Sequence, residues 1–243
     1  HLYLATEALV PTHNSYLEMG LAVTKHRKSM IFRRHKEDVG DLWSKLRAIC
    51  GMAGRPNESS KEWRDLPGDR RVRLVGLQHA WDWMKHQGNE NDYWAFDEAT
   101  QFPELAIRTL LAWCRSPDPK QKCQVVLGFN PPTTPEGEWV IEFFAPWLDD
   151  NYPNPAEPGE LRWFARLDDK DVEVADAAPF VHKNELVTPL SRTFFPARLE
   201  DNPILEAAGY RATLQGMPEP LRSQMLYGDF TIGLQDDVWQ VIP

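Results

Sequence analysis

Short apolar runs alternate with amphipathic helical patterns over the first 150 residues. The apolar runs at 29–33, 71–77, 93–96 and 124–129 predict buried strands. Apolar residues recur every three to four positions at 15–25, 38–49, 104–114 and 138–148, which predicts helices. Helices that alternate with fully apolar strands favour a layered α/β domain with a mainly parallel central sheet.

The remaining segments predict a more irregular second part. Residues 1–11 fit either a strand or an entry helix, and residues 50–68 indicate a connection that is mostly loop. Residues 149–159 are acidic and Pro-rich, which is typical of a border between subdomains. Beyond them we expect a hairpin at 161–166 and 171–174, a strand at 191–197, and two or three short helices within 202–228. The expected division is a core at 1–150 and a remainder at 151–243.

Composition argues against several classes of protein. A formal net charge of −9 argues against a broad basic face for nucleic acid. The basic runs at 25–36 and 64–73 are more typical of solvated helix ends and loops than of binding patches. Cys50, Cys114 and Cys123 have no metal-ligand spacing, so we expect a reducing cytosol and no zinc. No run is apolar enough to span a bilayer and no leader opens the chain, so a soluble protein is expected.

Polar side chains follow two neighbouring predicted strands. Asp97 and Glu98 end the run at 93–96, and Asn130 follows the run at 124–129. Parallel sheets place their chemistry at the carboxyl edge. Adjacent carboxylates repel each other unless a cation lies near them, and magnesium with a nucleotide phosphate is the usual candidate. The alternative is that both acids only cap the helix that follows.

Several short motifs, including those around Asp97 and Asn130, follow one another in an order that resembles the ATPase domain of the large terminase subunit, the genome-packaging motor of tailed bacteriophages. The matching segments are Arg33-Arg34, 71–73, 82–88, 96–99 (Phe-Asp-Glu-Ala), 128–131 (Gly-Phe-Asn-Pro), 195–197, 201–203 and 226–230. Each motif alone is weakly specific, and their order together is more specific.

The resemblance implies a fold and a cellular setting. It implies a P-loop NTPase-like, RecA/ASCE-type three-layer sandwich with a small C-terminal lid subdomain, and no nuclease domain in this chain. ATP and Mg²⁺ are the implied cofactors. Double-stranded viral DNA, the portal protein, the small terminase subunit and other copies in a homo-oligomeric ring are the implied partners. The implied location is the host cytoplasm, with transient attachment to the viral procapsid and no membrane.

The resemblance also assigns roles to residues. It makes Asp97 the acid that supports magnesium, Glu98 the catalytic base, and Asn130 a sensor that couples hydrolysis to movement. Arg33 or Arg34 would contact phosphate or hold a nearby loop, although a salt bridge to an acidic neighbour is an equal alternative. At Asp229 it implies a structural role.

The chain departs from the family at the phosphate-binding loop. A P-loop needs glycines, a lysine and a Ser or Thr, but residues 10–15 read Val-Pro-Thr-His-Asn-Ser. By position, Ser15 is the hydroxyl that would meet magnesium, and Asn14 stands where the lysine belongs. Either the loop is degenerate, or a loop of the parent protein is missing from this chain. The resemblance thus implies an ATP-driven DNA-packaging motor, with a nucleotide-binding-deficient scaffold or a helicase-type relative as alternatives.

Overall fold

A six-stranded mixed sheet forms the centre of the protein. The computed structural model describes residues 2–5, 10–79, 81–201 and 207–231. The strand order is β4-β5-β6-β3-β7-β8. Strands β6, β3, β7 and β8 are parallel, whereas β4 and β5 are antiparallel at one edge. The predicted α/β class with a mainly parallel sheet is therefore confirmed. The strands are β3 (Lys28–Arg33), β4 (Arg55–Asn57), β5 (Glu62–Leu66), β6 (Arg70–Gly76), β7 (Tyr93–Asp97) and β8 (Gln124–Gly128).

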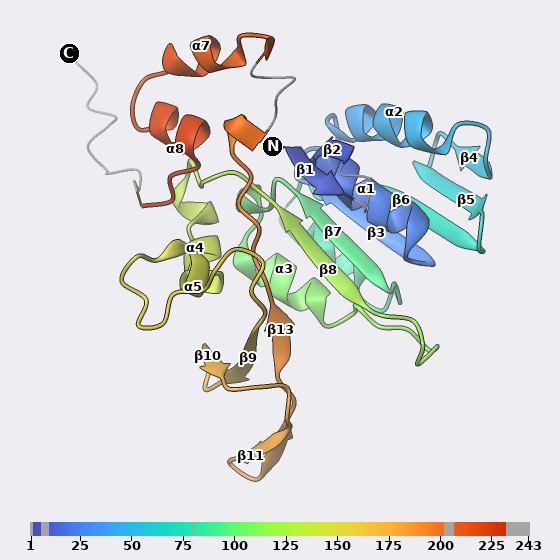
Figure 1. The fold of residues 1–243 in the computed structure, drawn as a ribbon. Coiled ribbons are helices and arrows are strands. Elements are labelled where there is room, and N and C mark those ends of the chain that lie inside the picture. The colour runs from blue at the N-terminus through green and yellow to red at the C-terminus, as the bar shows by residue number, and fades with distance from the viewer. Residues whose placement is uncertain (1, 6–9, 80, 202–206, 232–243) are drawn as a thin grey trace.

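Helices cover both faces of this sheet (Figure 1). Along β7, Tyr93 and Ala95 pack into the core on the side of α1 and α2, and Trp94 and Phe96 pack into the opposite core with α3. Successive side chains point to opposite sides of a strand, so an uninterrupted apolar run makes both faces of the sheet apolar. The helices are α1 (Asn14–Thr24), α2 (Val39–Cys50), α3 (Glu104–Leu111), α4 (Trp139–Phe143) and α5 (Ala145–Leu148). Single 3-10 turns lie at η1 (Asp82–His86), η2 (Ala99–Gln101), η3 (Pro135–Gly137) and η4 (Leu199–Asp201).

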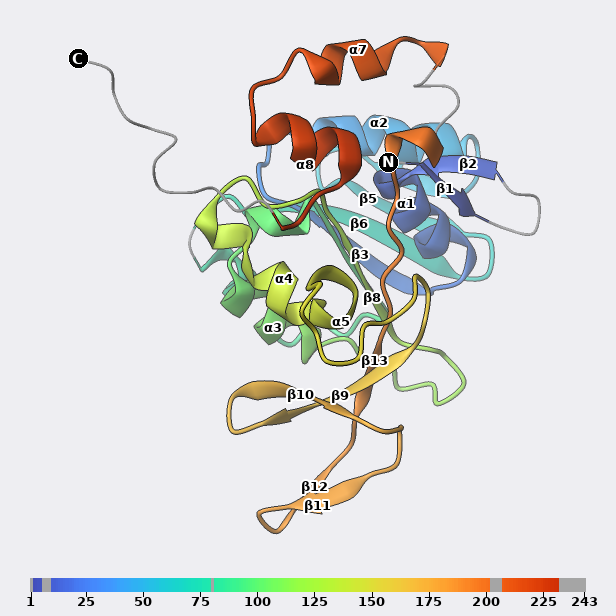
Figure 2. The same ribbon diagram turned by 60° about the vertical axis from the view of Figure 1, so that its left-hand side comes forward.

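The second half of the chain adds small elements around this core. Figure 2 shows the β11–β12 hairpin projecting at one end, while α7 and α8 lie at the other end. The predicted hairpin is present as β9 and β10, and β13 adds a third strand to it. Two of the predicted short helices are present, and residues 202–206 lie outside the described part. These elements are β9 (Arg162–Leu167), β10 (Lys170–Val174), β11 (Phe180–His182), β12 (Glu185–Val187), β13 (Leu190–Arg192), α7 (Tyr210–Gln215) and α8 (Leu221–Tyr227).

The N-terminal segment takes one of its two expected forms, and an edge hairpin differs from its expectation. Residues 1–11 fitted a strand or a helix, and β1 (Leu2–Ala5) pairs with β2 (Val10–His13). The segment 50–68 was expected to be mostly loop, but it forms the β4–β5 hairpin. A bulge between Trp63 and Leu66, with Asp65 at a positive φ of 54°, interrupts the alternation that would have predicted β5.

Three predicted elements are shorter than expected. The helix at 138–148 is divided into α4 and α5, because Pro146 has no N–H to donate to the preceding turn and its ring crowds that turn. Helix α3 ends at Leu111 rather than at Cys114. The strand at 191–197 forms pairs only within β13, which ends at Arg192. None of the helices in the described residues combines the length and apolar character needed to cross a bilayer.

Asp171 on β10 joins the small sheet to the core. Its carboxylate accepts hydrogen bonds from Arg108 on α3 at 2.9 Å and lies 2.7 Å from Arg192 Nη2 on β13. The Arg192 guanidinium also stacks 3.7 Å from the centre of the Phe143 ring. Burial alone would raise the pKa of Asp171, but the hydrogen bonds from Arg108 and Arg192 outweigh it and lower that pKa.

Asp171→Ala should lower the free energy of unfolding by about 3–5 kcal/mol, because it leaves the nearly buried Arg192 guanidinium without its anion. Urea unfolding measures this loss. Glu200→Ala is the control, because Glu200 pairs with Arg198 at the surface, where such a pair contributes less than about 1 kcal/mol. Equal losses in the two variants would contradict the joining role of Asp171.

Candidate active site

Asp97 ends β7 with its side chain on the α1 side of the sheet. The alternation that places Tyr93 and Ala95 on that side places Asp97 there as well. Ser15, on the first turn of α1, donates its hydroxyl hydrogen to Asp97 Oδ2 at 3.0 Å. Arg33, at the end of the neighbouring strand β3, donates to the same oxygen at 2.7 Å. The Asp97 side chain is only 3% exposed, so these two bonds fix a buried carboxylate at the carboxyl edge.

Glu98 turns away from this buried position towards solvent. Its φ of 60° lies in the left-handed region, which is uncommon for a residue other than glycine. The side chain is 29% exposed, and its Oε1 lies 4.0 Å from Arg33 Nη1. Asn130 Nδ2 donates to Glu98 Oε2 at 3.4 Å, so the amide after β8 meets the acid after β7. Burial, and then the charge of Asp97, raise the pKa of Glu98, while Arg33 and Asn130 oppose that rise.

Glu18 is a third acid in this cluster and was missed in the sequence. It lies one turn after Ser15 on α1, is 1% exposed, and neither carboxyl oxygen has a hydrogen-bond partner among the described residues. Burial raises its pKa well above the usual range, and the charges of Asp97 and Glu98 add to this effect. Glu18 belongs to the buried stripe of α1 with Met19 and Ala22, so a charged residue within an apolar stripe was the available signal.

Gly128 provides the space that the Glu18 carboxyl occupies. It lies opposite Asp97 in the pairing of β7 with β8. A Cβ atom at position 128 would lie 2.5 Å from Glu18 Oε1 and 3.3 Å from the Cβ of Asn14. A larger residue at position 128 would therefore require the Glu18 carboxyl to move from its place beside β8. Asn14 Oδ1 is buried here and has no hydrogen-bond partner in the described part of the chain.

Lys45 and Arg34 lie differently from the sequence-based expectation. Lys45, which the sequence analysis did not select, extends from α2 and places its Nζ 3.5 Å from Ser15 Oγ. Arg34 lies outside the cluster, because it donates to the backbone carbonyl oxygens of Leu77 and Gln78. The predicted residues Ser15, Asn14, Arg33, Asp97, Glu98 and Asn130 lie together around the end of β7.

The residues present fit magnesium in their chemistry. No group of three or more His, Cys, Asp or Glu side chains among the described residues is arranged to hold a metal ion. Magnesium, however, is usually held by one or two carboxylates together with waters and substrate phosphates. Ser15 and Asp97 supply hard oxygen atoms of this kind, and the carboxyl oxygens of Glu18 are without a hydrogen bond nearby.

The opposite, amino edge of the sheet carries a separate cavity of about 450 Å³. The two basic runs of the sequence meet there, but acids line the cavity as well and pair with the cations, as Glu90 does with Arg115 at 3.1 Å. The cavity is lined by Arg27, Lys28, Arg64, Arg70, Arg71 and Arg115, and by Asp65, Asp69, Glu90, Asp92 and Asp118. This mixture of charges does not favour one sign of ligand.

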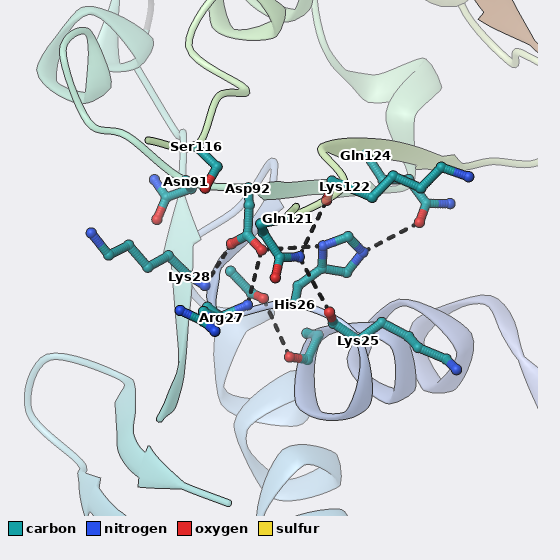
Figure 3. A network of polar contacts seen from close by, with 12 residues as sticks. Lys25, His26, Arg27, Lys28, Asn91, Asp92, Ser116, Gln121, Lys122 and Gln124 are labelled. Atoms are coloured by element: carbon teal, nitrogen blue, oxygen red, sulfur yellow. Dashed lines mark hydrogen bonds and ion pairs between the residues drawn. The ribbon is translucent and has the colours of Figure 1, made fainter. Parts of the chain in front are cut away.

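Asp92 is a buried acid beside this cavity, and it holds the backbone at the start of β3 (Figure 3). Asp92 accepts hydrogen bonds from the backbone N–H groups of Arg27 at 2.9 Å and Lys28 at 2.6 Å. His26 Nδ1 lies 3.5 Å from the same carboxylate, and His26 Nε2 lies 3.3 Å from Gln124 Oε1. Burial raises the pKa of Asp92, but the contact with His26 and the hydrogen bonds from the two N–H groups outweigh it, so the pKa is lowered. These bonds have a structural role.

Comparisons with known proteins give similarity only at the level of structure. No protein-family model matches the chain, and no curated protein matches it either. The large terminase ATPase domain of a Thermus phage is 12% identical with a TM-score of 0.44, over 88% of this chain and 80% of that one. The large terminase of a thermophilic bacteriophage is 15% identical with a TM-score of 0.38, over 49% of this chain and 30% of that one. Both of these proteins are large terminases.

Glu18→Gln should stabilise the protein at pH 8, because glutamine removes a buried ionisable carboxyl, and each unit by which its folded pKa exceeds its unfolded pKa costs the wild type about 1.4 kcal/mol. The gain should be smaller towards pH 4.5. The folded state holds the Glu18 proton more tightly than the unfolded state. The unfolding free energy of the wild type therefore falls as the pH rises from the unfolded pKa towards the raised folded pKa, and glutamine does not titrate.

Urea unfolding from pH 4.5 to 8, in buffer without divalent cations, measures this difference. The control is Glu136→Gln, an exposed acid on η3, which should change the unfolding free energy little at any pH. A constant difference between Glu18→Gln and wild type across this range would contradict the raised pKa.

Proposed function

We propose that this chain is the ATPase domain of a large terminase subunit, which hydrolyses ATP and uses the energy to move double-stranded DNA into a procapsid. The observation that carries the proposal is the chain of contacts from Ser15 through Asp97 and Arg33 to Glu98 and Asn130 at one edge of a parallel sheet. The order of the sequence motifs, which resembles that family, adds support independent of these contacts.

The two adjacent acids have different surroundings, and this supports different roles. Asp97 is buried and fixed by Ser15 and Arg33, which suits an acid that positions other groups. Glu98 is partly exposed and its pKa is raised. A general base whose pKa lies closer to neutral pH is a better proton acceptor. Glu98 would orient a water molecule and accept its proton, and Asn130 would hold the Glu98 carboxylate in place.

Ser15 and Asp97 are the residues that would hold magnesium. A magnesium ion bound there supplies positive charge that stabilises the negative charge on the phosphate groups during transfer. Arg33 keeps the Asp97 carboxylate oriented through its hydrogen bond to Oδ2.

As a motor, the protein would act together with several partners. The partners would be double-stranded viral DNA, the portal protein, the small terminase subunit and further copies of the chain in a ring. The protein would work in the host cytoplasm while attached to the procapsid. The order of the sequence motifs is the basis for proposing these partners and this location.

Glu98→Gln should lower the ATP turnover of the full-length protein by about 100-fold or more, because it removes the proton acceptor and keeps the shape. Magnesium–ATP affinity should change little. Glu90→Gln is the matched control, because Glu90 pairs with Arg115 at the amino edge, far from the proposed chemistry. Wild-type turnover in Glu98→Gln would refute the assignment of the base.

The second candidate function is a scaffold that keeps the fold without hydrolysis. It is favoured by residues 10–15, which contain no glycine and no lysine. Calorimetric titration of the chain with a magnesium–ATP analogue separates the two candidates. We expect binding with a dissociation constant below about 0.1 mM, equivalent to more than about 5 kcal/mol of binding free energy. No heat of binding at millimolar ligand would favour the scaffold.

A further inference from the structure

The candidate site needs positive charge from outside residues 10–15. A triphosphate carries several negative charges, and Asp97, Glu98 and Glu18 line the end of β7 as acids. Phosphate sites usually include a lysine or arginine to balance such charge. Asn14, at the position where a phosphate-loop lysine would stand, is neutral.

Arg33 is not free to supply this charge. Its Nη1 donates to Asp97 Oδ2 at 2.7 Å and lies 4.0 Å from Glu98 Oε1. Moving Arg33 to a phosphate would leave the buried Asp97 carboxylate without its cation, which is costly. Within the described residues, the positive charge would therefore come from an element other than β3.

Lys45 reaches the site from α2. It is half-buried, and its Nζ lies 3.5 Å from Ser15 Oγ and 6.0 Å from the centre of the Tyr16 ring. Within the described residues, Lys45 has no carboxylate oxygen within the 4.0 Å that defines an ion pair, whereas Arg47 on the same helix pairs with Glu58 at 2.7 Å. An ammonium group without a close anion at the edge of an acidic site is available to an anionic ligand.

The position of Lys45 is fixed by the core. Its neighbours Leu42 and Leu46 are almost completely buried and pack in the same apolar cluster as Met19 and Ala22 of α1. Helices α1 and α2 are therefore held side by side, which directs Lys45 towards Ser15. A lysine stem can pack along apolar surface while its charged end remains near water.

We propose that Lys45 binds the phosphates of a nucleoside triphosphate at Ser15 and supplies the positive charge that Asn14 lacks. The inference rests on the proposed function, because it assigns a ligand contact to the same site. Lys45 would recognise the polyphosphate part of the ligand and not the nucleoside. Inorganic tripolyphosphate with magnesium should therefore bind with the same dependence on Lys45 as magnesium–ATP.

Lys45→Met tests the proposal, because methionine keeps much of the aliphatic stem and removes the charge. Calorimetric titration of the full chain with magnesium–tripolyphosphate and with magnesium–ATP should give affinities about 10- to 100-fold weaker than wild type. Lys45→Arg should keep most of the affinity. Arg47→Met is the matched control, because it removes a cation from the exposed face of the same helix, and it should bind as wild type does.

Lys45 labelling gives a second readout that does not depend on a variant. Acetylation of wild-type protein, followed by mass spectrometry, should show Lys45 protected by magnesium–tripolyphosphate and exposed Lys36 unprotected. Unchanged affinity in Lys45→Met, no protection of Lys45, or no binding of tripolyphosphate by the wild type would each overturn the proposal.

The outcomes also separate this proposal from the proposed function. Normal binding by Lys45→Met together with lost turnover in Glu98→Gln would overturn the role of Lys45 alone. Weakened binding by Lys45→Met together with normal turnover in Glu98→Gln would support the role of Lys45 and overturn the assignment of the base.

Discussion

The burial of β7 on both faces is the constraint on which the candidate site depends. All of its residues from Tyr93 to Asp97 are buried, and they alternate between two apolar cores. A strand in this environment has no exposed polar side chain along its length, so its first polar groups come at its end. The same alternation decides that Asp97 faces α1, where Ser15 meets it.

The acids at this edge are held together with the help of nearby cations. Burying carboxylates close to one another is unfavourable unless cations lie near them or protons neutralise them. Arg33 bonds Asp97 directly, while Arg33 and Lys45 both oppose the raised pKa of Glu18. A site of this kind, with more acid than its own cations balance, attracts further positive charge. Together with Lys45 at its rim, it suits a ligand that brings a divalent cation and phosphates together.

Sequence patterns predict the parts of this site that follow from strand periodicity. Asp97, Glu98 and Asn130 were found because parallel strands present their carboxyl ends at one edge. The period of two also distinguishes the arginines, because Arg33 shares the face of Ile31 and Arg34 does not. Glu18 had one local signal, a charged residue within the apolar stripe of α1. Lys45 depends on how α1 and α2 pack together, and no local pattern contains that packing. The β4–β5 hairpin was missed because a bulge disrupts its alternation.

The amino edge of the sheet determines the geometry at the carboxyl edge. Asp92 bonds the N–H groups of Arg27 and Lys28, and His26 links that carboxylate to Gln124 at the start of β8. These contacts fix how β3, β7 and β8 are aligned. With this alignment, Phe32 lies opposite Phe96 and Asp97 lies opposite Gly128. A shift of β7 by one residue would turn Asp97 towards the other core, and a shift of β8 by one residue would replace the glycine beside Glu18 with Leu127 or Phe129. The polar network at one end of the strands is thus a structural requirement for the acidic site at the other.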